Sequence, residues 1–96
     1  MSVEIGTLIV REPSFKHGRP HIAGTGITVH RVVILYNSGD SPEEIVRNYP
    51  HLTLAGVHAA LAYYHANQPE ISAEIEADEA EYFRLEREFT NARQVA

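Results

Sequence analysis

Residues 40–71 constrain the fold more than any other part of the chain, because they hold two helix starts with one stop between them. The sequence Ser-Pro-Glu-Glu at 41–44 places a cap, a first-turn proline and a capping-box glutamate in their preferred order. Pro50 ends the helix that this sequence begins, and Thr53 is suited to cap a second helix after it. This segment therefore predicts two helices joined by a very short turn, which is the skeleton of a helix-turn-helix.

A further helix is expected before this pair, with Thr28 as its cap and Gly39 after its last turn. Its apolar face falls at spacings of three, four and seven: Val29, Val32, Val33 and Tyr36. The helix that Thr53 begins has a similar inward face: Leu54, Val57, Leu61 and Tyr64. The helix between them has Ile45, Val46 and Tyr49 as its buried side. Three helices with one apolar face each predict a small tri-helical core.

The N-terminal part predicts short strands and a loop. Residues 7–10, Thr-Leu-Ile-Val, favour a strand, and residues 14–26 are rich in glycine and proline and favour a loop. Extended residues at the end of this loop, from Gly26, would pair back against the first strand, within the chain or across a dimer. We expect a mostly α fold with short N-terminal β-strands and a C-terminal helix.

Composition indicates one small soluble domain with an appendage, and we place the boundary between residues 1–68 and 69–96. Basic and acidic side chains cancel in the first part, whereas the second has eight acidic and three basic residues. The chain has no cysteine, no basic start followed by an apolar run, and no apolar run of membrane-spanning length. These features predict a cytoplasmic location and no membrane contact.

The acidic C-terminal segment predicts a helix from Pro69 to about residue 92 that suits a basic partner surface. Its apolar stripe supplies the candidate partner-binding residues: Ile71, Ile75, Tyr82, Leu85 and Phe89. An equally good interpretation is a solvated helix that folds back on the first helix or pairs with its twin in a dimer.

Basic residues gather in and around the loop, and they indicate a phosphate-contacting arm beside the helix-turn-helix. The candidate DNA-binding residues are Lys16, Arg19, Arg31 and His58. Arg19 alone could equally hold carbonyl groups of the glycine-rich turn in place. The third helix has no Arg or Lys. Its outer face predicts packing against a second copy or against the acidic helix at least as well as base contacts; this face comprises Ala55, His58, Ala59, Ala62 and His65.

Neither metal binding nor catalysis is expected. His17 and His21 lie in a loop, while His51, His58 and His65 have no carboxylate at ligand spacing. The serines lack the context of a nucleophile elbow. We predict that the protein is not an enzyme and has no cofactor.

Three motifs follow one another in order: Gly-Arg-Pro-x-Ile-x-Gly-Thr-x-Ile-x-Val at 18–29, Gly-x-Ser-x-Glu-Glu-Ile at 39–45, and Tyr-Pro-x-Leu-Thr at 49–53. Together they resemble the DUF433 family of small bacterial proteins seen beside PIN-like ribonuclease genes. Two places depart from the pattern: Gly26, where the family commonly has Arg, and Ala55-Gly56, where it commonly has an acidic pair. The first predicts fewer phosphate contacts, and the second a weaker helix start.

The resemblance implies a homeodomain-like or winged-helix-like tri-helical fold. It also implies an antitoxin of a type II toxin–antitoxin system, in which a homodimer binds operator DNA and neutralises a PIN-like toxin. The acidic C-terminal helix would do the neutralising. The alternative from another class is a protein-interaction or assembly module that never binds DNA.

Overall fold

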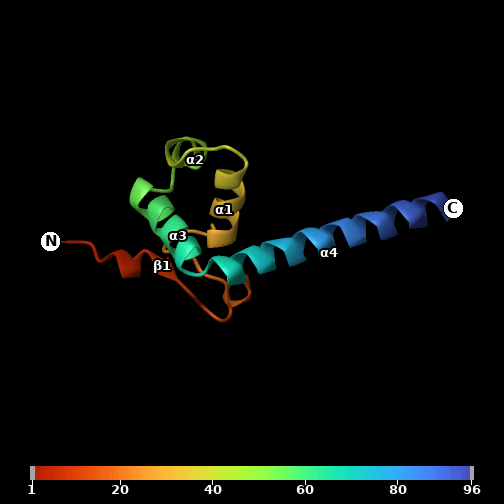
Figure 1. Cartoon of the computed structure of the whole chain (residues 1–96), viewed down its shortest axis with the longest axis horizontal. Helices are drawn as coiled ribbons and strands as arrows, with labels where there is room; N and C mark the ends of the chain where they lie inside the picture. The colour runs from red at the N-terminus through yellow and green to blue at the C-terminus, as the bar shows by residue number, and fades with distance from the viewer. Residues whose placement is uncertain (1, 96) are drawn as a thin grey trace.

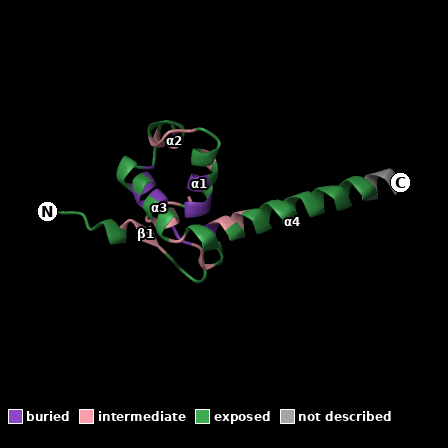
Figure 2. Ribbon diagram, in the orientation of Figure 1, coloured by how far each residue is buried: buried purple, intermediate pink, exposed green. Residues whose placement is uncertain are grey.

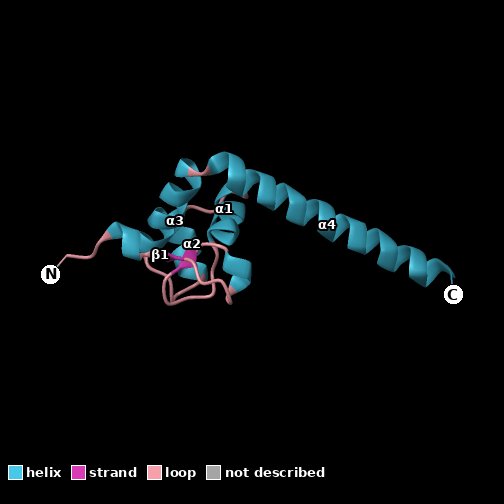
Figure 3. Ribbon diagram, turned by 90° about the horizontal axis from the view of Figure 1, so that it is seen from below, coloured by secondary structure: helices cyan, strands magenta, loops and turns pink. Residues whose placement is uncertain are grey.

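The computed structural model describes the backbone of residues 2–95 and the side chains of residues 2–91, and within them the chain is mostly helical (Figures 1 and 3). Its α-helices are α1 (Val29–Asn37), α2 (Pro42–Asn48), α3 (Leu54–Ala66) and α4 (Gln68–Val95). Its short N-terminal elements are the 3-10 helices η1 (Ile5–Thr7) and η2 (Lys16–Gly18) and the strands β1 (Ile9–Val10) and β2 (His21–Ile22).

The three predicted helix caps are confirmed, and at the start of α3 Thr53 Oγ1 accepts a hydrogen bond from the Gly56 amide at 3.0 Å. Thr28 Oγ1 accepts a hydrogen bond from the Arg31 amide at 3.1 Å, and α1 begins at the next residue. Ser41 and Glu44 form both halves of the capping box at the start of α2, each at 3.2 Å. These bonds satisfy amide groups that a helix start would otherwise leave unpaired.

The strand prediction is confirmed in part. β1 pairs with β2 in an antiparallel sheet, with Ile9 opposite Ile22 and Val10 opposite His21. We expected the pairing residues near Gly26, and this is wrong: they lie within the segment that we assigned to the loop. A tight turn at Gly24, whose φ is +77°, returns the chain so that the Ile22 amide donates to the Ile27 carbonyl at 2.9 Å.

The hydrophobic core lies between α1, α2 and α3 and is closed by β2 and the first turns of α4 (Figure 2). Its fully buried side chains include Val29, Val32, Val33, Ile45, Val57 and Ile71. Leu54 and Tyr36, which we expected to face inward, are 43% and 44% exposed. Leu54 is the first residue of α3 and Tyr36 lies in the last turn of α1, so both sit at helix ends beyond the core.

Gly56 allows α3 to lie close to the sheet. A Cβ atom at this position would stand 3.0 Å from Ile22 Cγ2 and 3.3 Å from Thr53 Oγ1. Glycine costs about 1 kcal/mol of helix propensity, but a larger residue would push α3 away from β2. The glycine that we expected to weaken the start of α3 therefore has a packing role.

Helix α4 starts against the edge of the domain and leaves it as a long extension (Figures 1 and 3). It begins at Gln68, beside the boundary that we predicted, yet Ile71 is fully buried and Ile75 packs against the core. We call residues 68–78 the base of α4 and residues 79–91 the arm. The base is part of the domain, whereas the arm is exposed along its whole length.

Candidate partner-binding surface on helix α4

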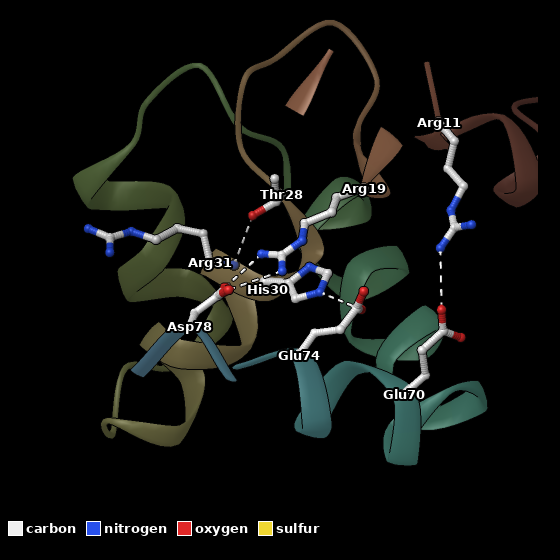
Figure 4. Close-up of polar contacts among 8 residues, drawn as sticks. All are labelled: Arg11, Arg19, Thr28, His30, Arg31, Glu70, Glu74 and Asp78. Carbon is white, nitrogen blue, oxygen red and sulfur yellow. Dashed lines mark hydrogen bonds and ion pairs between the residues drawn. The ribbon is translucent and has the colours of Figure 1, made fainter. Parts of the chain in front are cut away.

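Three acidic residues spaced four apart attach the base of α4 to the domain (Figure 4). A spacing of four puts them on one face of the helix. Their partners come from different segments, and the contacts are Glu70–Arg11 at 3.8 Å, Glu74–His30 at 2.9 Å and Asp78–Arg19 at 2.7 Å. The base is therefore held both by apolar burial of Ile71 and by this neighbouring row of contacts.

The contact between Arg19 and Asp78 has the geometry of a paired salt bridge. Arg19 Nη1 donates to Asp78 Oδ2 at 2.7 Å, and Nη2 donates to Oδ1 at 3.1 Å. These hydrogen bonds lower the pKa of Asp78 against a smaller opposing effect of desolvation, and they raise the pKa of Arg19. Two parallel charge-assisted bonds fix the direction of both side chains.

His30 lies beneath the base and is almost wholly buried. Its Nε2 atom is 2.9 Å from Glu74 Oε1, and its buried Nδ1 atom has no hydrogen-bond partner among the described residues. The imidazole ring thus has one hydrogen bond among the described residues, and this bond joins α1 to α4.

The arm exposes large apolar side chains. Tyr82, Phe83, Leu85 and Phe89 are 65%, 59%, 50% and 64% exposed, respectively. Tyr82 and Phe83 stand edge to face with ring centroids 5.6 Å apart. A run of exposed aromatic residues on one projecting helix is unusual for a surface without a binding role.

Charged side chains also form ion pairs along the arm. Arg84 donates to Glu81 on one side and to Glu88 at 2.6 Å on the other. These contacts raise the pKa of Arg84 and lower that of Glu81. Because all three side chains are exposed, the pairs order the surface of the helix more than they stabilise the protein.

The structure divides the five predicted partner-binding residues between two environments. Ile71 and Ile75 belong to the core, whereas Tyr82, Leu85 and Phe89 are exposed on the arm. Sequence analysis missed the exposed Phe83, because it falls outside the spacing of the stripe. It also missed the acidic residues of the base, although their spacing of four was visible in the sequence.

The predicted DNA-binding residues come from three segments of the chain, and one of these residues forms an ion pair with a side chain of α4. Arg19 is bound by Asp78, while Arg31 on α1 is exposed and points away from the row of contacts at the base (Figure 4). Lys16 is exposed in η2, with its Nζ 5.8 Å from the centre of the Phe15 ring. His58 is exposed on α3.

The alanine-rich face of α3 packs in part against the N-terminal segment of the same chain. Ala59 is only 6% exposed. A hollow of about 330 Å³ lies between the two, and its lining residues are Ile5, Gly6 and Ile9 from the N-terminal segment and Ala59, Ala62 and Tyr63 from α3, which contacts both η1 and β1. We expected such packing to come from a second copy or from the acidic helix, and here the N-terminal segment supplies it.

The part of the chain that the structure describes has neither a metal-binding cluster nor a membrane-spanning helix. The described residues contain no group of three or more His, Cys, Asp or Glu side chains placed to hold a metal ion. None of the helices they form is both long enough and apolar enough to cross a membrane.

Comparisons with known proteins identify the family. Residues 9–64 match the family described as "Protein of unknown function (DUF433)", so the chain belongs to DUF433. A crystal structure of a DUF433 member protein from Anabaena variabilis is similar, with 33% sequence identity and a TM-score of 0.69. The similarity covers 73% of this chain and 69% of that one. No curated protein matches the sequence.

Proposed function

We propose that this protein is a non-enzymatic antitoxin of a type II toxin–antitoxin system, which binds and neutralises a co-encoded PIN-like ribonuclease through the arm of α4. The observation that carries the proposal is the exposure of Tyr82, Leu85 and Phe89 on a helix that projects beyond its own domain. An amphipathic helix of this kind binds by laying its apolar face in a groove.

The charge of the arm supports a nuclease as the partner. Residues 79–91 contain four glutamates and two arginines. A groove that binds RNA carries positive charge to attract phosphate, so an acidic helix can occupy it in place of the substrate. The aromatic residues would supply most of the binding energy, while the carboxylates would steer the encounter.

A second role in operator binding has weaker support. The short connection between α2 and α3 suits a homeodomain-like or winged-helix-like helix-turn-helix, in which α3 would enter the major groove. The exposed Lys16, Arg31 and His58 would contact DNA. The alternative remains an assembly module that does not bind DNA, and a DNA-binding assay distinguishes the two.

The test is a ribonuclease assay with the product of the adjacent gene. Tyr82→Asp and Leu85→Asp place a charge at the centre of the interface and should each reduce inhibition at least about tenfold, as expected for central interface residues. Ala80→Asp adds the same charge at an exposed position outside the stripe and should leave inhibition unchanged. Full inhibition by both stripe variants would disprove the role of the arm.

A further inference from the structure

The apolar stripe of α4 follows a coiled-coil repeat through the base and into the arm. Its positions advance by alternating steps of four and three: Ile71, Ile75, Asp78, Tyr82, Leu85 and Phe89. This is the spacing of a and d positions in a heptad, and it keeps the side chains on one face with a drift of only about 20° per heptad. We call these six positions the seam.

The two halves of the seam differ in what covers them. In the base, Ile71 is fully buried, Ile75 packs against the core and Asp78 binds Arg19. In the arm, Tyr82 and Leu85 are 65% and 50% exposed. The domain therefore covers the start of the seam, and the continuation of the same face is exposed.

Four acidic residues flank the exposed seam. Glu81 and Glu88 come directly before Tyr82 and Phe89, and Glu79 and Glu86 come directly after Asp78 and Leu85. In a coiled coil these are the g and e positions, which face the partner and decide which partner is accepted. Arg84 binds the first pair within the chain. Glu79 and Glu86 make no ion pair with any described residue.

This charge pattern argues against a second copy of the chain as the occupant. In a parallel pair, Glu81 of one copy would face Glu86 of the other. In an antiparallel pair, each row of glutamates would face the same row of the second copy. Both arrangements bring carboxylates together, and such like-charge contacts disfavour association.

We propose that the exposed half of the seam binds one apolar helix or groove of a different protein, flanked by lysine or arginine side chains that pair with Glu79 and Glu86. The inference rests on the proposed function, because it specifies the kind of surface that the nuclease would present. It also predicts that the chain does not self-associate through the arm, in contrast to the homodimer that the family resemblance implies.

Two synthetic helical peptides test the chemistry of this surface with the full chain. Both have three heptads and a leucine seam, and they differ only in having lysine or glutamate at the flanking positions. The full chain should bind the lysine peptide at least about tenfold more tightly than the glutamate peptide, and added salt should reduce the difference. Sedimentation should show a monomer.

Two double variants make the same change of charge, one at the flanking positions of the seam and the other at exposed positions away from them. Glu79→Lys with Glu86→Lys should reverse the peptide preference, whereas Glu4→Lys with Glu76→Lys should preserve it. Leu85→Asp should abolish binding of both peptides. Equal binding of the two peptides, an unchanged preference in the first double variant, or a dimer that Leu85→Asp dissolves would each overturn the inference.

The two proposals fail in different ways. Preference for the lysine peptide without any inhibition of the co-encoded nuclease would retain the surface and reject the antitoxin function. Inhibition of the nuclease that is equal for the unaltered protein and for the variant with Glu79→Lys and Glu86→Lys would retain the function and reject the flanking-charge inference.

Discussion

The Arg19 guanidinium, from the loop before β2, holds the Asp78 carboxylate, 59 residues later in the chain, through two parallel hydrogen bonds. Among the described ion pairs between α4 and the rest of the domain, this pair lies farthest along the helix. It joins a residue that we expected to bind DNA with an acidic residue that lies between Ile75 and Tyr82 of the apolar stripe. Arg19 can therefore contact another group only when its bonds to Asp78, which hold α4 where the arm begins, are broken.

The first prediction concerns the pH dependence of stability. Because Arg19 lowers the pKa of Asp78 from its ordinary value of 3.8, the pair stabilises the protein above that pH. The contribution disappears as the pH falls through the lowered pKa. Asp78→Asn should cost up to about 1 kcal/mol at pH 7, since the pair is partly exposed. In urea unfolding, the difference from the unaltered protein should shrink as the pH falls below 3.8.

A control separates this effect from general acid destabilisation. Glu76→Gln removes an exposed carboxylate on the same helix that has no described ion pair. Its unfolding free energy should follow that of the unaltered protein at every pH. A constant difference between Asp78→Asn and the unaltered protein from pH 7 to pH 2 would contradict the assignment.

The second prediction concerns nucleic-acid binding. If the protein binds operator DNA, Asp78→Asn should increase affinity several-fold, because Arg19 then becomes free to contact a phosphate. Arg19→Ala should remove this gain in the double variant. Arg31→Ala should weaken binding about equally with or without Asp78→Asn. Fluorescence anisotropy at two salt concentrations measures these affinities, and binding should weaken at the higher one.

The elements with local causes could be predicted from the sequence. Thr28, Ser41 and Thr53 act on amide groups within three residues of themselves, so their roles were visible in the sequence. The contacts of Asp78 and Glu74 cross more than 40 residues, and no local pattern reports their partners. The stripe on α4 was visible too, but the point where the domain stops covering it depends on tertiary packing.

The third prediction tests the close approach of α3 and β2. Gly56→Ala gains about 1 kcal/mol of helix propensity, but its methyl group would stand 3.0 Å from Ile22 Cγ2. Overpacking of this kind costs about 1–3 kcal/mol, so we expect a net loss of about 1 kcal/mol in the free energy of unfolding. Gly6→Ala is the control, because a Cβ there meets nothing within 4 Å. A higher free energy of unfolding for Gly56→Ala would contradict this, because it would show that β2 can shift to make room for the methyl group without destabilising the protein.

The last prediction tests the division of α4 into base and arm. Ile71→Ala removes a fully buried side chain and should lower the free energy of unfolding by about 2–5 kcal/mol. Leu85→Ala changes a half-exposed residue of the same helix and seam, and should change the free energy of unfolding by no more than about 0.5 kcal/mol.

Partner binding should respond in the opposite order, since Leu85 lies in the proposed interface and Ile71 does not. Thermal unfolding and a binding titration on the same two variants measure both effects. Similar destabilisation by the two substitutions would mean that the arm folds back on the domain in solution, and the projecting surface proposed for the partner would then be lost.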